Sequence, residues 1–188
     1  MAGRIAAEYG RRVKTFDCVV AADRKHGIGA NHGLPWPKLK TDVKHFRELT
    51  TAAPAGKRNA VIMGRKTWDT VPPKFRPLPD RWNLIISRGA VELAGDARLA
   101  RSLDEALALA SAADDVDQIF VIGGAEIYRQ AFEHVRCRDV VLTRIDGEFE
   151  SDTHIPDVTE RFDLIERGTT IHESGYDYAI ERWRRRGR

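Results

Sequence analysis

Five short runs of apolar residues recur along the chain, and each is followed by a stretch of mixed polarity. Within a run the apolar residues are continuous instead of alternating with polar ones, which is typical of strands covered on both faces. We therefore predict five buried strands, which span residues 16–22, 59–64, 83–87, 118–124 and 139–145.

The segments between these runs have helical periodicity, and we predict helices over residues 39–51, 65–71, 102–112 and 125–134. Helical spacing places apolar side chains on one face of the first segment, at Leu39, Val43, Phe46 and Leu49. The third segment opens with a capping box from Ser102 to Glu105. Alternating strands and helices indicate an α/β domain with a largely parallel sheet.

The C-terminal part has a different pattern. Residues 162–171 and 176–183 read as two strands with no helix between them, so we expect them to pair antiparallel at one edge of the sheet. We interpret residues 16–188 as one domain and residues 1–15 as an N-terminal extension of unknown purpose.

Composition and charge narrow the class of protein. The chain has 188 residues and a net charge of +3, which does not demand a nucleic-acid or membrane partner. No apolar stretch approaches the roughly 20 residues of a membrane span, and the N-terminus lacks the apolar core of a secretory signal. Residues 181–188 carry five arginines. They can be read as an RNA contact, but we favour a solvated charge run.

The two cysteines, Cys18 and Cys137, are not spaced like metal ligands or a redox motif. Cys18 lies inside an apolar run, so we predict a buried thiol in a reducing compartment, hence a cytoplasmic location. The sequence indicates no metal cluster, and a monomer is the default expectation.

In open α/β sheets, ligands bind at the carboxyl ends of the strands, and four predicted strands end in suggestive sequences. The first is followed by a loop with three glycines, "ADRKHGIGANHGLPW" (22–36), which reads as a mobile lid or as an ordinary connection. The second is followed by "MGRKTW" (63–68), which reads as an anion site at a helix start or as exposed basic residues.

The third and fourth strand ends add two further candidates. Ser87 and Arg88, together with Arg101, can converge on a second phosphate and favour NADP over NAD, or they are scattered surface residues. Gly123 and Gly124 allow a ligand to approach the backbone closely, although the GxGxxG fingerprint is absent.

Asp42 is a carboxylate at the edge of the apolar face of a predicted helix. Taken alone, it reads as a helix-start aspartate stabilised by the helix dipole. Six motifs in the sequence together indicate a functional role for Asp42. In order and spacing they resemble the dihydrofolate reductase family: "GIGANHGLPW", a carboxylate six residues after that tryptophan, "VIMGRKTW", "RPLPDRWNLIIS", "VIGGAEIY" and "LTRIDGEFESDTHIP".

The resemblance runs from about residue 16 to the C-terminus and implies a fold and a reaction. The fold is a mostly parallel central sheet of about eight strands with an antiparallel C-terminal hairpin and about four flanking helices. The reaction is the NADPH-dependent reduction of 7,8-dihydrofolate to 5,6,7,8-tetrahydrofolate, which serves one-carbon metabolism and is the target of antifolates.

The resemblance assigns the catalytic end of the site to four residues. Asp42 is expected to bind the amino group and ring N–H of the pterin and to support protonation of its imine nitrogen. Thr143 is expected to bond Asp42, Trp36 to hold an ordered water, and Leu34 to pack in the lid. Further substrate contacts are implied at Val19, Val20, Ala21, Val43, Phe46, Val71, Arg76, Leu78, Arg81, Ile122 and Tyr128.

Among these, Arg81 matches the arginine that grips the α-carboxylate of the glutamate tail. The small side chain of Val43 implies a roomier tail pocket, and Asp152 matches a carboxylate that supports the lid in some members. Gly123 and Gly124 match a pair joined by a cis peptide. Cofactor contacts are implied at Ala21, Ile28, Gly29, Gly64, Arg65, Lys66, Thr67, Ser87, Arg88, Arg101, Ile122, Gly123, Gly124, Ala125, Glu126, Ile127 and Tyr128.

Two alternatives compete with this interpretation. A pyrimidine reductase of riboflavin synthesis has the same fold but lacks the pterin carboxylate and the tail arginine, so Asp42 and Arg81 speak against it. The second alternative is a nucleotide- or RNA-binding module that uses the arginine-rich C-terminus. The intact Asp42 and lid argue against this alternative.

Overall fold

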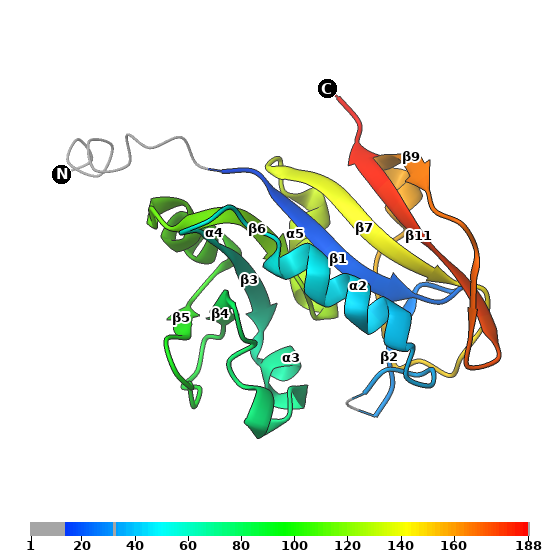
Figure 1. The fold of residues 1–188 in the computed structure, drawn as a ribbon, viewed down its shortest axis with the longest axis horizontal. Helices are drawn as coiled ribbons and strands as arrows, with labels where there is room; N and C mark the ends of the chain where they lie inside the picture. The colour runs from blue at the N-terminus through cyan, green and yellow to red at the C-terminus, as the bar shows by residue number, and fades with distance from the viewer. Residues whose placement is uncertain (1–13, 32, 188) are drawn as a thin grey trace.

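The computed structural model describes residues 14–31 and 33–187, so most of the expected N-terminal extension lies outside the described residues. The chain forms a twisted central sheet with helices on both faces (Figure 1). The helices are α2 (Lys40–Thr51), α3 (Arg65–Thr70), α4 (Leu103–Ala112) and α5 (Ala125–Glu133), with two single 3₁₀ turns at Pro73–Phe75 and Val158–Glu160.

Eleven strands are present among the described residues: β1 (Phe16–Ala22), β2 (Gly27–Gly29), β3 (Arg58–Gly64), β4 (Arg81–Ile86), β5 (Arg98–Ala100), β6 (Val116–Val121), β7 (Cys137–Ile145), β8 (Thr153–His154), β9 (Phe162–Arg167), β10 (Ile171–Glu173) and β11 (Tyr176–Arg185). Nine of them form the main sheet in the order β10-β11-β7-β1-β6-β3-β4-β5, with β9 also paired to β11. Strands β9 and β10 share one edge because they pair with successive parts of β11.

The predicted fold class is confirmed by this topology. Strands β7, β1, β6, β3, β4 and β5 are mutually parallel. Strand β11 is antiparallel to β7 and to both edge strands. The single strand predicted over 162–171 is wrong, because the chain is divided there into β9 and β10. The very short β2, β5 and β8 were not predicted, since two or three residues carry no readable periodicity.

Both faces of the sheet are covered, which explains the continuous apolar runs. On one face, Ile62 and Val121 pack with Leu107 of α4 and Phe132 of α5. On the other face, Val61 and Met63 pack with Trp68 of α3, and the α2 side chains Phe46 and Leu49 pack against them. Figure 1 shows α2 crossing in front of β1 while α4 and α5 lie behind the sheet.

The capping box predicted for α4 is present. Ser102 is the N-cap of α4, and its Oγ accepts the backbone N–H of Glu105 at 3.1 Å. The carboxylate of Glu105 reaches back to the N–H of Arg101 at 2.7 Å, which is one residue before the position that the motif usually bonds.

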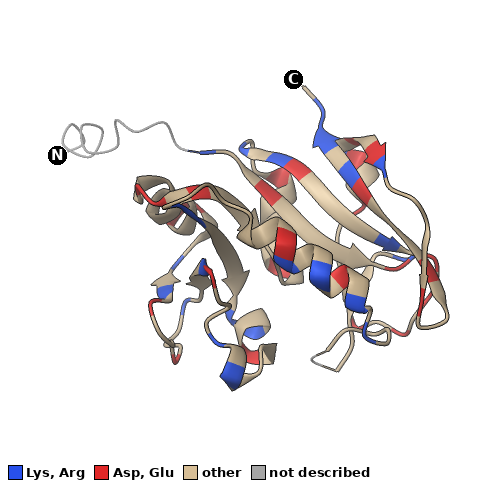
Figure 2. Cartoon of the chain, in the orientation of Figure 1, with Lys and Arg blue, Asp and Glu red and all other residues tan. Residues whose placement is uncertain are grey.

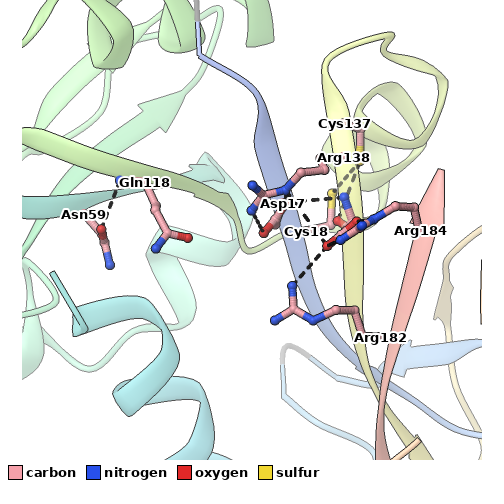
Figure 3. A network of polar contacts seen from close by, with 9 residues as sticks. Asp17, Cys18, Asn59, Gln118, Cys137, Arg138, Arg182 and Arg184 are labelled. Atoms are coloured by element: carbon pink, nitrogen blue, oxygen red, sulfur yellow. Dashed lines mark hydrogen bonds and ion pairs between the residues drawn. The ribbon is translucent and has the colours of Figure 1, made fainter. Parts of the chain in front are cut away.

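The described part of the arginine-rich C-terminal segment is partly exposed, but it belongs largely to a strand and its arginines are paired. It continues β11, where Arg182 and Arg184 bind the fully buried Asp139 with N–O distances of 2.7 to 3.0 Å. Arg138 binds the neighbouring buried Asp17, and Figure 3 shows these side chains converging across β1, β7 and β11. Figure 2 shows basic and acidic residues side by side on β7 and β11.

The two cysteines are neighbours in space although 119 residues apart in sequence. Cys18 on β1 and Cys137 on β7 are both buried and unoxidised, with Sγ atoms 3.8 Å apart (Figure 3). Burial raises the pKa of the Cys18 thiol, as expected for a thiol in apolar surroundings. The prediction of a buried Cys18 is confirmed.

No helix within the described residues is long and apolar enough to cross a membrane.

Candidate functional site

The central feature of the site is a contact between Asp42 and Thr143. Asp42 is the third residue of α2, and Thr143 lies on β7, where it pairs with Ala21 of β1. The Thr143 hydroxyl donates to Oδ1 of Asp42 at 2.6 Å. The structure thus brings together the first turn of α2 and the carboxyl ends of β1 and β7, as predicted.

The carboxyl group of Asp42 has a raised pKa. Burial is the main cause, because a carboxylate is poorly solvated there. The hydrogen bond from Thr143 and the nearby His45 act in the opposite direction, whereas the negative charge of Glu173 raises the pKa further. Asp42 is therefore a partly desolvated acid, as is common for groups that handle protons.

Trp36 lies beside the start of α2. Its side chain is buried in a cluster with Leu39, Ile145 and Tyr178. Its ring packs edge-on against Phe149, with centroids 5.7 Å apart. The indole Nε1 is buried and has no hydrogen-bond acceptor among the described residues. A buried indole N–H usually finds an acceptor, so this atom fits the predicted bridging water.

The glycine-rich loop after β1 contacts the segment that follows β7 at two points. Strand β2 pairs with β8, and Oδ2 of Asp152 accepts the N–H of Asn31 at 3.0 Å. The predicted contact between Asp152 and the loop is therefore present. Leu34 is 56% exposed on this loop, and Ile28 and Gly29 belong to β2. His32 lies outside the described residues.

Asp23 was missed in the sequence analysis, although it fixes the base of this loop. It is fully buried, and its Oδ1 accepts the N–H groups of Lys25 and Gly27 at 2.9 and 2.7 Å. Its Oδ2 accepts the N–H of Phe149 at 3.0 Å. An aspartate directly after a strand and four residues before a glycine is a turn signal that could have identified the local half of this arrangement.

Three glycines lie close together where β3 and β6 end. Gly123 and Gly124 are joined by a cis peptide, and the N–H of Gly64 donates to the carbonyl of Gly123 at 2.7 Å. A Cβ atom on Gly124 would lie 3.1 Å from Oγ1 of Thr67, and one on Gly64 equally close to Ile127. A side chain at either position would therefore push against its neighbours, which explains why glycine occurs there.

Helix α5 begins directly after this glycine pair, with Ala125, and α3 begins after Gly64 on the neighbouring strand. Exposed Glu126 has its pKa lowered to about 2, chiefly by hydrogen bonds from Arg129 and Gln130. Ile127 and Tyr128, two further predicted contacts, have buried side chains that pack beside Gly64 and Gly123. The Tyr128 hydroxyl donates to the carbonyl of Val19 at 2.6 Å.

The basic residues predicted to bind phosphates follow the ends of β3, β4 and β5, which are neighbouring strands. The Nη1 atom of Arg101 donates to the carbonyl oxygens of Ser87, Arg88 and Gly89, at 2.9 to 3.1 Å. It thereby brings the three predicted residues of the second phosphate site together. Arg65 is paired with Asp69 at 2.9 Å and Lys66 is exposed.

Arg81 is a buried cation at the other end of α2. Its side chain donates to Thr50 Oγ1 at 2.7 Å and to the Pro79 carbonyl at 2.9 Å, and it stacks near the ring of Phe46. Burial lowers its pKa. Among the described residues no carboxylate forms an ion pair with it. A buried unpaired guanidinium calls for an anionic ligand.

Some of the other predicted substrate contacts lie around Phe46, next to Arg81, and others do not. Phe46, Leu78 and Ile122 border the same apolar cluster as Val19, while Val71 is half-buried and Val43 is largely exposed. Val20 is also buried, but it packs in the core on the opposite face of the sheet. Arg76 is held by the carbonyls of Asp69 and Val71, so it is directed to the end of α3.

Asp42 and Thr50 are eight residues apart on α2, which corresponds to about 12 Å along the helix. The arrangement therefore places a carboxylate acceptor at one end of α2 and a cation at the other. Such a pair suits an elongated ligand with N–H donors at its head and a carboxylate at its tail. Arg47 is a further charge near Arg81 that the sequence analysis did not single out.

Comparison with known proteins gives one consistent result. The family model described as Dihydrofolate reductase matches residues 15–185. A dihydrofolate reductase of Sus scrofa is 40% identical over 183 residues, covering 90% of this chain and 97% of that protein. One of Mus musculus is 43% identical over 151 residues, covering 78% and 81%. The bifunctional dihydrofolate reductase-thymidylate synthase 1 of Arabidopsis thaliana is 41% identical over 150 residues, covering 76% and 29%.

Proposed function

The chain belongs to the dihydrofolate reductase family, and we propose that its site reduces 7,8-dihydrofolate to 5,6,7,8-tetrahydrofolate with NADPH as cofactor. Membership of this family makes it an oxidoreductase of tetrahydrofolate synthesis. The observation that carries the assignment of the site is the Asp42–Thr143 contact at one end of α2 with the unpaired Arg81 at the other.

Asp42 orients the substrate. A carboxylate accepts several hydrogen bonds, so the oxygen lone pairs that Thr143 leaves free can bind the pterin amino group and ring N–H. Charge-assisted bonds of this kind are short and directional. They hold the ring in the geometry that hydride transfer requires, in which the reacting atoms are nearly in contact.

Asp42 also favours protonation of the pterin imine nitrogen. The negative charge stabilises the cation that develops there. Trp36 Nε1 is a free donor beside α2, so we assign it to a water that delivers the proton. The exposed Leu34 on the loop after β1 packs over the bound ligand.

Arg81 binds the carboxylate of the glutamate tail. Its guanidinium is already oriented by Thr50 and Pro79, so little side-chain entropy remains to be lost on binding. Phe46, Leu78 and Ile122 flank the path between the two ends. The exposed Val43 leaves room there for bulky antifolate inhibitors.

NADPH supplies the hydride when bound, and the residues present fit it. We assign the main chain of Gly64, Gly123 and Gly124, at the carboxyl ends of β3 and β6, to the dinucleotide. The cations after β3 and β4 suit its phosphates, and Arg101 holds Ser87 and Arg88 in one loop that suits a 2′-phosphate.

Two further assignments concern the cellular location and the oligomeric state. The free and buried Cys18 and Cys137 support a reducing, cytoplasmic location, and we assign a monomer. Because Arg182 and Arg184 are committed to Asp139, they give little support to the alternative of an RNA-binding module.

The direct test is oxidation of NADPH by the purified protein with dihydrofolate, followed by NADPH absorbance, with Asp42→Asn beside it. We expect rapid oxidation by the unmodified protein and a large loss in the variant, smallest at low pH, where the substrate is more easily protonated. Binding of NADPH without turnover of dihydrofolate would overturn the substrate assignment, and a ribityl-phosphate pyrimidine would then be tried.

A further inference from the structure

Glu173 binds the start of α2 from a distant part of the chain. It is the last residue of β10, and its two carboxylate oxygens accept the N–H groups of Lys40 at 2.6 Å and Thr41 at 3.1 Å. The residue at the N-cap position is Leu39, which offers no side-chain acceptor. Glu173 therefore supplies from β10 the acceptor that an N-cap serine or aspartate would normally give.

The carboxylate of Glu173 is itself held in place. The hydroxyl of Tyr178, whose side chain is 1% exposed, donates to its Oε2 at 2.8 Å. Ser174 follows in the tight turn between β10 and β11, and its Oγ donates to the carbonyl of Lys38 at 3.2 Å. The hairpin thus contacts the chain on both sides of the point where α2 begins.

Asp42 directly follows the capped residue Thr41. Its backbone position is set by the first turn of α2, and its carboxylate is set by Thr143. We propose that Glu173 is a positioning residue of the reductase, which holds the first turn of α2 so that Asp42 meets both Thr143 and the substrate. This inference rests on the function proposed above for Asp42.

Glu173 also sets the electrostatic environment of Asp42. Three titratable groups act there: His45 on the same helix, Glu173 on β10 and Tyr178 on β11, while Thr143 on β7 contributes a neutral donor. The hydrogen bond from Tyr178 is the main reason why the pKa of Glu173 is lowered, so Glu173 is charged at neutral pH. Removing this charge should make proton binding at Asp42 and at the nearby substrate less favourable.

The test compares three variants with the unmodified protein. Glu173→Gln removes the charge and keeps the size, Glu173→Asp keeps the charge but shortens the reach, and Asp177→Asn is the matched control. Asp177 lies in the same hairpin and pairs with His172 instead of α2. The measurements are the pH profile of kcat, KM for dihydrofolate and NADPH, and the pKa of the Asp42 carboxyl by NMR in the ligand-free protein.

For Glu173→Gln we expect kcat to fall about tenfold, as for a lost charged hydrogen bond, with KM for NADPH unchanged. The pKa of Asp42 and the midpoint of the pH profile should both move down, because the negative charge of Glu173 raises the pKa of Asp42. Glu173→Asp should keep the pKa of Asp42 near that of the unmodified protein while losing part of kcat. Asp177→Asn should change none of these quantities.

Two results would overturn the inference. One is an unchanged kcat and an unchanged pKa of Asp42 in Glu173→Gln. The other is a lower melting temperature with kcat per folded molecule and both pH midpoints unchanged, since Glu173 would then serve the fold alone. The NMR titration needs neither substrate nor cofactor, so failure of the proposed activity is distinguishable from failure of this inference.

Discussion

Thr143 and Asp42 are 101 positions apart in the sequence, yet Oγ1 of one lies 2.6 Å from Oδ1 of the other. Thr143 lies on β7, which pairs with β1, and Asp42 lies in the first turn of α2. The contact therefore joins the central sheet to α2. Several expected outcomes depend on this contact and on the cation at the far end of α2.

Thr143→Val removes the hydroxyl and keeps the shape of the side chain. Because the hydrogen bond lowers the pKa of Asp42, its loss should raise that pKa further. We expect kcat/KM for dihydrofolate to fall about tenfold, as for a hydrogen bond to a charged group. Steady-state kinetics test this, and an unchanged kcat/KM would show that Asp42 is oriented without Thr143. The affinity for NADPH should stay constant.

Asp42→Asn should stabilise the fold at neutral pH while it removes activity. The pKa of Asp42 is raised in the folded state, so the folded protein loses stability as the pH rises from about 4, the ordinary aspartate value, through the raised one. The asparagine variant should therefore melt a few degrees higher at pH 7, and the difference should vanish below about pH 4. Calorimetry at several pH values tests the sign, and a lower melting temperature at pH 7 would contradict it.

Arg81→Met keeps much of the buried length of the side chain and removes its charge. We expect KM for dihydrofolate to rise about a hundredfold, as for a lost charge-assisted pair, with a smaller effect on kcat. A pterin substrate without a glutamate tail should be reduced equally by both proteins. If the tailless substrate suffers as much as dihydrofolate, Arg81 acts on the fold and not on the tail.

Gly124→Ala should impair cofactor binding. The new Cβ would lie 3.1 Å from Oγ1 of Thr67, so Thr67, which is itself assigned to the cofactor, would have to shift. Gly187→Ala is the matched control, because nothing lies within 4 Å of a Cβ at that position and it is not among the residues assigned to the cofactor. Fluorescence titration with NADPH should show at least about a tenfold loss for the first variant. Equal affinities in the two variants would remove Gly124 from the cofactor site.

Asp139→Ala tests the polar network beneath the C-terminal strand. Burial alone would raise the pKa of Asp139, but hydrogen bonds from Arg184 and Arg182 outweigh it and keep the group ionised. Removing the buried partner of two arginines should cost about 3 kcal/mol of stability. Urea unfolding measures this, and the kcat of the folded fraction should not change. A cost near zero would mean that the arginines find other acceptors.

The fold could be predicted from the sequence because continuous apolar runs report strands buried on both faces, and the capping box reports the start of α4. Asp42, Thr143 and Arg81 could be identified as candidates only by the motifs around them, since Asp42 lies on α2 and Arg81 at the start of β4. The motif around Tyr128 did not indicate where its side chain lies: it is buried, and its hydroxyl donates to the carbonyl of Val19.

The remaining features depend on contacts that no local pattern reports. Glu173 caps a helix more than 130 positions away, and Arg184 meets Asp139 across two antiparallel strands. The sequence pattern of residues 181–188 is the same whether its arginines face water or a buried carboxylate. Only the pairing of β11 with β7 decides between these possibilities.

A buried guanidinium without a carboxylate partner attracts any small anion that can reach it, because the anion restores charge balance in a poorly solvated place. For Arg81 this means that the buffer itself is a competitor of the substrate. Sulfate and phosphate should raise the apparent KM for dihydrofolate more than chloride at equal ionic strength. Affinities measured in different buffers will therefore differ even when the protein and the ligand are the same.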